Sequence, residues 1–187
     1  MIFKETKLKG AYVIDLERIE DERGFFARSW CQKEFEKHGL NPLIVHCNIS
    51  YNIKKGTLRG MHYQAAPYAE AKIVSCISGA IYDVIIDLRR DSPTYCQWFA
   101  VELSSDNYRM LYIPVGLAHG FQTLKEYTAV YYQMSEFYNP DSSRGVRWDD
   151  PSFGVEWPIK KAIISLKDRQ FPDFISSKSN SVADKDK

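Results

Sequence analysis

Short apolar segments separated by polar turns run along most of the chain. Side chains alternate over 80–89, where Tyr82 falls on one face of the segment and Asp83 on the other. Enrichment in β-branched and aromatic residues predicts seven strands: 11–19, 42–53, 71–79, 80–89, 96–103, 109–116 and 128–135. Turn residues such as Gly, Pro, Asn, Asp and Ser lie between them. Many short strands at regular spacing are typical of an all-β sandwich or barrel.

Only one segment, 32–40, has the pattern of a helix, and we expect Gly39 to close it as a C-cap. No repeat or linker divides the chain, so a single barrel domain is expected over residues 1–175. The tail over 176–187 is polar and nearly free of apolar residues, which predicts disorder.

Composition excludes several classes of protein. The net charge of +1 gives no electrostatic footprint for nucleic acid. The N-terminal segment lacks the apolar stretch of a signal peptide, and no apolar run is long enough to cross a membrane. The four cysteines have no C-x-x-C spacing, as in a reduced cytosolic chain. We therefore expect a cytoplasmic protein without nucleic-acid or membrane partners.

Candidate chemistry begins at His62, in the stretch GTLRGMHYQ over 56–64. A lone strand histidine is more often satisfied by a neighbouring carbonyl than used in chemistry. A second histidine, His119, follows a Pro-x-Gly-x-x-His spacing that resembles the second motif of the cupin superfamily of jelly-roll barrels. The first cupin motif has two alternating histidines, but here Gln64 takes the second place.

Two imidazoles without a convincing carboxylate partner fall short of the three protein ligands that a catalytic metal normally has. We therefore expect no metal and no other cofactor. Both histidines become candidates for acid–base chemistry, which needs a pKa near neutrality and a protected cavity.

Longer motifs occur in one register between Lys7 and Phe174: DERGFF, GTLRGMHYQ, AKIVSCISGAIYDVIIDLR, SPTYCQW, LYIPVGLAHGF, YNPDSSRGVRWDDPSFGVEWP and SLKD. Together they resemble the dTDP-4-dehydrorhamnose 3,5-epimerase family of sugar-nucleotide enzymes. The resemblance implies an all-β, cupin-type jelly-roll barrel with a few short helices. It also implies an isomerase that inverts C3, C5 or both of a nucleoside-diphospho-4-keto-6-deoxy sugar, in deoxysugar and O-antigen-type lipopolysaccharide biosynthesis.

The resemblance assigns four catalytic residues. His62 removes a proton alpha to the ketone, and Asp168 of SLKD holds its imidazole in the useful tautomer. Lys72 stabilises the enolate as a fixed cation, although as a strand residue it could instead be a solvated lysine. Tyr132 returns a proton on the opposite face of the sugar.

For two of these assignments the sequence offers an alternative residue. Tyr131 competes with Tyr132, and strand alternation allows only one of the two side chains to point inside the barrel. Asp168 could instead be a helix or turn cap, in which case Asp83 is the fallback partner of His62.

The resemblance also implies a set of residues that bind the nucleotide sugar. Arginine suits the diphosphate because its planar guanidinium binds phosphate oxygens in pairs. Arg23, Arg59 and Tyr138 are assigned to the diphosphate, and His119 lines the sugar site. The complete set is Arg23, Asn48, Arg59, Asp83, His119, Tyr138 and Lys167.

Departures from the family pattern gather at the nucleotide end. Arg28 stands where the family usually has an acid, His46 replaces a common glutamine, and Ile19 takes a usually aromatic position. Ser75 and Val115 stand where the family usually has an arginine and a glutamate. The nucleotide is therefore open, with thymidine as the family default, as is the choice between inversion at C3, at C5 or at both.

Two other functions stay open: a metal-dependent cupin such as a dioxygenase, and a non-catalytic sugar-binding cupin. The acid–base residues argue against the second, because binding alone needs no such pair. We also expect a homodimer in which residues near the N-terminus cross to the partner barrel, because family members pair in this way and an exposed strand edge is a liability.

Overall fold

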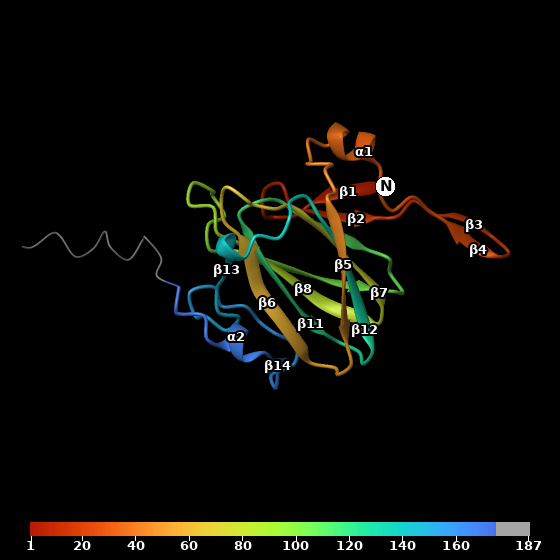
Figure 1. Cartoon of the computed structure of the whole chain (residues 1–187). Coiled ribbons are helices and arrows are strands. Elements are labelled where there is room, and N and C mark those ends of the chain that lie inside the picture. Colours follow the sequence, from red (N-terminus) through yellow and green to blue (C-terminus); the bar gives the residue numbers. More distant parts are fainter. Residues whose placement is uncertain (175–187) are drawn as a thin grey trace, which may run out of the picture.

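Two sheets packed face to face form the body of the molecule in a computed structural model, which describes residues 1–174 (Figure 1). The first sheet has the order β1-β2-β10-β7-β12-β5, and all of its pairs are antiparallel. Its strands are β1 (Ile2–Glu5), β2 (Tyr12–Asp15), β10 (Met110–Ile113), β7 (Lys72–Ser78), β12 (Thr128–Met134) and β5 (His46–Asn52).

The second sheet has the order β13-β6-β11-β8-β9, and the short strand β14 pairs in parallel with β6. Its strands are β13 (Ser143–Gly145), β6 (Thr57–Gln64), β11 (Leu117–Thr123), β8 (Ala80–Asp87), β9 (Trp98–Ser104) and β14 (Ile163–Ile164). The only helices in the described part of the chain are α1 (Gln32–Lys37), α2 (Leu166–Arg169) and a 3-10 turn (Pro140–Ser142). The predicted all-β fold with a few short helices is confirmed.

Helix α1 ends as expected from its glycine. Gly39 has a φ of +68°, its N–H donates to the Glu36 carbonyl, and the Leu40 N–H donates to the Phe35 carbonyl. This is the Schellman arrangement, which needs a residue in the left-handed conformation. The predicted helix over 32–40 therefore includes its own C-terminal cap.

Strand prediction was least accurate around turns and glycines. The predicted segment 109–116 contains the whole of the four-residue strand β10 and then the turn into β11, where Gly116 has a φ of +85°. The central strands β6 and β11 are absent from the seven predicted segments. Glycines within them weaken the strand pattern, although strand glycines often mark a bulge or a close approach of two backbones. The polar tail over 176–187 lies outside the described residues.

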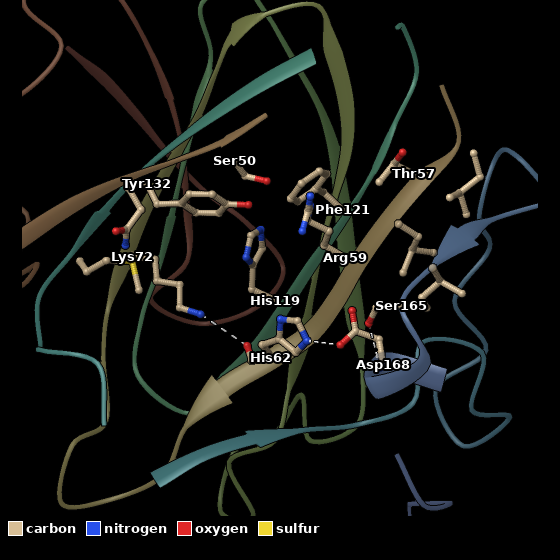
Figure 2. Close-up of a pocket in the computed structure, with 15 residues that line it drawn as sticks. Ser50, Thr57, Arg59, His62, Lys72, His119, Phe121, Tyr132, Ser165 and Asp168 are labelled. Atoms are coloured by element: carbon tan, nitrogen blue, oxygen red, sulfur yellow. Dashed lines mark hydrogen bonds and ion pairs between the residues drawn. The ribbon is translucent and has the colours of Figure 1, made fainter. Parts of the chain in front are cut away.

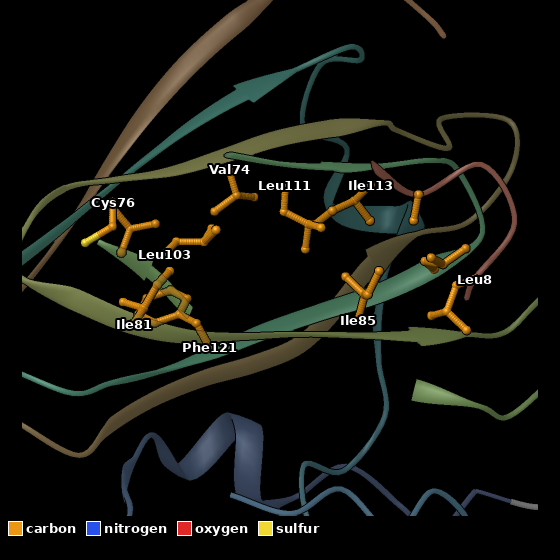
Figure 3. Close-up of a cluster of buried hydrophobic side chains, with 12 residues drawn as sticks. Leu8, Val74, Cys76, Ile81, Ile85, Leu103, Leu111, Ile113 and Phe121 are labelled. Carbon is orange, nitrogen blue, oxygen red and sulfur yellow. The ribbon is translucent and has the colours of Figure 1, made fainter. Parts of the chain in front are cut away.

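The main core fills one part of the space between the sheets (Figure 3). Alternation sends every second side chain of β7, β8, β10 and β11 into this layer. Its buried members include Leu8, Val74, Cys76, Ile81, Ile85, Leu103, Leu111, Ile113 and Phe121.

The chain over 146–174 covers the outer face of the second sheet. Val84 and Ile86, on the outward side of β8, belong to a buried cluster with Phe153 and Trp157. Strand β8 is therefore buried on both faces, as expected for a central strand covered on both sides. Within residues 1–174 no comparable segment covers β5 of the first sheet, where Ile49 and Tyr51 are exposed.

Strands β3 (Ile19–Asp21) and β4 (Gly24–Phe26) form a separate hairpin that projects away from the two sheets (Figure 1). All of its residues are exposed. At its base, the Arg18 guanidinium lies 4.7 Å from the Phe25 ring centroid and 4.9 Å from that of Tyr108. These cation–π contacts fix the hairpin's direction without burying its tip.

Candidate active site

A cavity of about 600 Å³ lies between the two sheets, beside the apolar core. One wall comes from β6 and β11, and the facing wall comes from β5, β7 and β12 (Figure 2). The C-terminal segment closes one side with Ser165 and Asp168. The polar and aromatic lining residues are Asn48, Ser50, Thr57, Arg59, His62, Lys72, His119, Phe121, Tyr132, Ser165 and Asp168.

A bulge in β6 turns Arg59 and His62 towards the same cavity. Residues three apart on a regular strand point to opposite faces. Here His119 on β11 lies opposite His62 while Phe121 lies opposite Arg59, so two residues of β6 between these pairs lie opposite one of β11. A Cβ atom on Gly60 would lie 2.5 Å from the Gly120 Cα, so glycine is required for this close approach.

His62 is paired with Asp168 across 106 residues of sequence. The imidazole Nε2 lies 2.7 Å from Asp168 Oδ1, while the side chain stays 42% exposed. Figure 2 shows the other ring nitrogen turned towards the cavity. The Asp168 N–H donates to Ser165 Oγ at 3.1 Å, so the N-cap of α2 fixes the position of the carboxylate.

Burial opposes ionisation of Asp168, but the hydrogen bond and charge of His62 and the Gly60 N–H outweigh it and lower the pKa of the carboxyl. Asp168 is therefore ionised at neutral pH. An ionised partner at Nε2 favours the tautomer with the lone pair on Nδ1 and stabilises the imidazolium once a proton is taken.

Tyr132 lies on the wall opposite His62. Its ring packs edge-on against His119, with centroids 6.0 Å apart. Burial and, secondarily, the charge of Asp83 raise the pKa of the phenol far above its ordinary value, so the hydroxyl keeps its proton at neutral pH. Tyr131 points to the other face of β12, where it interacts with Cys47. Alternation along β12 thus brings Tyr132, and not Tyr131, into the cavity.

Lys72 reaches the same cavity from β7, with its side chain only 9% exposed. Its Nζ lies 2.9 Å from Glu70 Oε1 and 3.5 Å from the backbone oxygen of His62 (Figure 2). The alternative of a solvated strand lysine does not describe this environment.

Asp83 is fully buried behind His119 and does not line the cavity. Its Oδ1 lies 2.7 Å from His119 Nε2, so it is the partner of His119 and not the fallback partner of His62. Burial raises the pKa of the Asp83 carboxyl, with the positive charges of His119 and Lys72 acting in the opposite direction. The buried pair fixes the ring of His119 at the cavity surface.

The remaining predicted binding residues fall into three groups. Asn48 and Arg59 line the cavity, and Asn52 Oδ1 accepts from Arg59 Nε at 2.8 Å. Tyr138 and Lys167 line a second cavity of about 620 Å³, which shares Asn48, His62 and Met134 with the first. Arg23 is not brought to either cavity, since it lies on the β3–β4 hairpin with an 83% exposed side chain and pairs with Asp21.

Sequence reasoning missed several residues of the site. Ser50 and Phe121 line the first cavity, each two positions after a predicted binding residue. Alternation along the predicted strand 42–53 would have found Ser50, whereas β11, which carries Phe121, was not predicted as a strand. Ser165 stands three residues before Asp168, the spacing of a helix N-cap. Among the departures from the family pattern, only His46 lines either cavity, with its ring stacked on Phe137 at 6.1 Å.

Within residues 1–174, no three or more His, Cys, Asp or Glu side chains are placed to hold a metal ion together. The same part of the chain contains no helix that is long and apolar enough to cross a membrane.

Two largely antiparallel sheets with a cavity between them form the cupin-type jelly roll. An imidazole–carboxylate pair opposite a protonated phenol supplies the groups that acid–base catalysis needs. The family model for dTDP-4-dehydrorhamnose 3,5-epimerase matches residues 5–176. The chain belongs to this family and is therefore an isomerase, as the motifs predicted.

Individual relatives match nearly end to end. A dTDP-4-dehydrorhamnose 3,5-epimerase of Shigella flexneri is 39% identical over 92% of this chain and 96% of its own length. The crystal structure of the enzyme from Elizabethkingia anophelis superposes with a TM-score of 0.90 at 40% identity, covering 93% of this chain and 96% of that one. The crystal structure of the Bacillus anthracis enzyme with TDP and PPi bound superposes with a TM-score of 0.89 at 42% identity, covering 92% of this chain and 99% of that one.

Proposed function

We propose that the enzyme inverts C3, C5 or both of dTDP-4-dehydro-6-deoxy-D-glucose through an enolate intermediate. One observation carries the proposal: the imidazole of His62 and the phenol of Tyr132 come from opposite sheets and face one cavity. Inversion at a carbon requires removal of a proton from one face and its return to the other. Two groups on the same face of the sugar could not do both.

His62 acts first. The C–H bonds at C3 and C5 are acidified because both carbons are alpha to the C4 ketone. Nδ1 of His62 takes the proton, and the ionised Asp168 at Nε2 stabilises the imidazolium. The electron pair moves to the C4 oxygen, where the Lys72 ammonium stabilises the enolate in a partly dry site.

Tyr132 completes the inversion by donating its phenolic proton to the opposite face of the same carbon. The enolate is thereby consumed and the ketone re-forms. Both side chains then recover their starting protonation by exchange with water. Because burial keeps the phenol protonated, Tyr132 begins each turnover as the acid of the pair.

The residues that bind the nucleotide are proposed from their charge and from the ligands bound to a relative. Arg59, Tyr138 and Lys167 line the two adjoining cavities and suit a diphosphate, with Asn48 beside them. The Bacillus anthracis relative was crystallised with TDP and PPi. Thymidine is therefore the proposed base. We further propose a cytoplasmic catalytic unit over residues 1–175 that serves deoxysugar and O-antigen-type lipopolysaccharide synthesis.

A direct test measures the exchange of the substrate's carbon-bound hydrogens with solvent. In deuterated buffer, the wild-type enzyme is expected to wash deuterium from solvent into C3, C5 or both of dTDP-4-dehydro-6-deoxy-D-glucose and to keep its rate in EDTA. NMR of the product reports which carbon carries the label. Loss of activity in EDTA that one metal restores would instead support a metal-dependent cupin. No exchange at either carbon would rule out the proposed substrate or reaction.

We also propose a homodimer, which the exposed apolar surface supports. Ile49 and Tyr51 on β5, Ile53 directly after it, and Ile77 on β7 are all exposed on the outer side of the first sheet. Contiguous apolar patches of this kind are typical of interfaces. The projecting β3–β4 hairpin is suited to carry Arg23 to a partner's cavity.

Light scattering at micromolar concentration is expected to give twice the mass of one chain. A charge on the apolar face, in Ile49→Asp, is expected to raise the dissociation constant at least about 100-fold, because an unpaired charge would be buried in the interface. Val115→Asp, at an exposed turn outside this face, is the matched control. A monomeric wild type would contradict the proposal.

A further inference from the structure

A buried carboxylate next to the catalytic cavity has no role in the mechanism described so far. Glu70 lies two residues before Lys72, and the side chains are 7% and 9% exposed. Glu70 Oε1 and Lys72 Nζ are 2.9 Å apart. Glu70 lines the second cavity while Lys72 lines the first, so this ion pair forms part of the wall between them.

The contacts of Lys72 show where each N–H donor of its ammonium group is directed. An ammonium group has three N–H donors. One is directed to Glu70, and a second reaches towards the backbone oxygen of His62 at 3.5 Å. The third is left for an acceptor in the cavity (Figure 2). Two fixed contacts on a flexible four-carbon side chain thus determine where the remaining N–H points.

The contact with Glu70 also determines the charge of the Lys72 side chain. A buried ammonium is strongly disfavoured unless a counter-charge compensates for its lost hydration. Glu70 is the only carboxylate in contact with Lys72 among the described residues. The other titratable groups facing Lys72 are His62 on β6, His119 on β11 and Tyr132 on β12, with Asp83 on β8 behind His119. On β10 its neighbour is Ile113, which carries no charge.

We propose that Glu70 is a positioning residue, which keeps the Lys72 side chain protonated and aims one N–H at the substrate's ketone oxygen. This role rests on the proposed epimerase function. Glu70 itself touches no reacting atom in this arrangement. Its effect on the reaction therefore passes entirely through Lys72.

The substitution Glu70→Gln tests this role with little change of shape. The amide can still accept a hydrogen bond from Lys72 but carries no charge. We expect kcat to fall about 10- to 100-fold, the effect of losing a charge-assisted hydrogen bond, with little change in KM. The basic limb of the pH–kcat profile is expected to move to lower pH by about one unit or more, because burial now favours the neutral amine.

Three comparisons separate positioning from a merely structural role. Glu70→Asp keeps the charge on a shorter side chain and is expected to restore the wild-type basic limb even where kcat recovers only in part. Glu102→Gln, at an exposed position on β9, is the matched control and should leave the profile unchanged. In a Lys72→Met background, Glu70→Gln should cost almost nothing further, since the two effects share one interaction.

An unchanged basic limb in Glu70→Gln, or an equal loss of kcat in the Lys72→Met background, would overturn the inference. A readout without substrate keeps it separate from the proposed function. The NMR signal of the Lys72 side chain, assigned by its absence in Lys72→Met, should titrate at lower pH in Glu70→Gln than in the wild type. A wild-type enzyme that fails to turn over the sugar would refute the function, whereas an unshifted titration would refute only the role of Glu70.

Discussion

Replacement of His62 with asparagine is expected to abolish deuterium exchange at every centre of the sugar that the wild-type enzyme labels. Asparagine can keep a hydrogen bond to Asp168 but has no lone pair of suitable basicity to remove a carbon-bound proton. The loss of a general base typically costs about 10²- to 10⁴-fold in rate. Because deprotonation precedes every later step, exchange and inversion should fall together.

The measurement is incorporation of deuterium into C3 and C5, followed by NMR in deuterated buffer. His38→Asn is the matched control, because that ring stacks on Phe3 at 4.1 Å and lines neither cavity. If His62→Asn exchanged deuterium at the wild-type rate, His62 would be an ordinary strand histidine held by its carboxylate. The proposed mechanism would then be wrong.

Replacement of Tyr132 with phenylalanine is expected to separate exchange from inversion. The substitution leaves His62, Asp168 and Lys72 in place, so the enolate still forms and His62 can return a deuteron to the face it came from. Only the acid on the opposite wall is lost. Inversion should fall about 10²- to 10⁴-fold, as for loss of a general acid, while exchange with retention stays within about tenfold of the wild type.

Tyr131→Phe is the matched control, since the neighbouring phenol lies on the other face of β12 and outside the cavity. The label at C3 and C5 is read with the configuration at each carbon, which also shows which centres the enzyme inverts. A Tyr132→Phe enzyme that still inverts at the wild-type rate would exclude the phenol as the acid. Equal loss of exchange and inversion would mean that Tyr132 also takes part in deprotonation.

Local pattern was enough to predict much of this molecule. Alternation and β-branched content located the strands that became β2, β5, β7, β8, β9, β10 and β12, because these preferences act within a few residues. The same alternation allowed only one of Tyr131 and Tyr132 inside, and the motifs chose Tyr132. The ordered motifs between Lys7 and Phe174 also predicted the family, which the comparisons confirm.

What the sequence left open depends on contacts between distant segments. The choice of Asp168 over Asp83 as partner of His62 was decided by packing of α2 against β6, 106 residues away along the chain. The bulge that turns Arg59 and His62 into one cavity exists because Gly60 and Gly120 meet across two strands. No local propensity encodes either pairing.

The sequence by itself therefore determined the strand content, the family and the residue types available for acid–base chemistry. Tertiary structure alone decided that His62 and Tyr132 lie on opposite sheets, that Glu70 is buried against Lys72, and that Arg23 lies on a hairpin away from its own cavity. The physical reason is that propensities and alternation act over a few residues. The placement of His62 and Tyr132 on facing walls, and the burial of the Lys72–Glu70 ion pair, depend instead on the packing of two sheets.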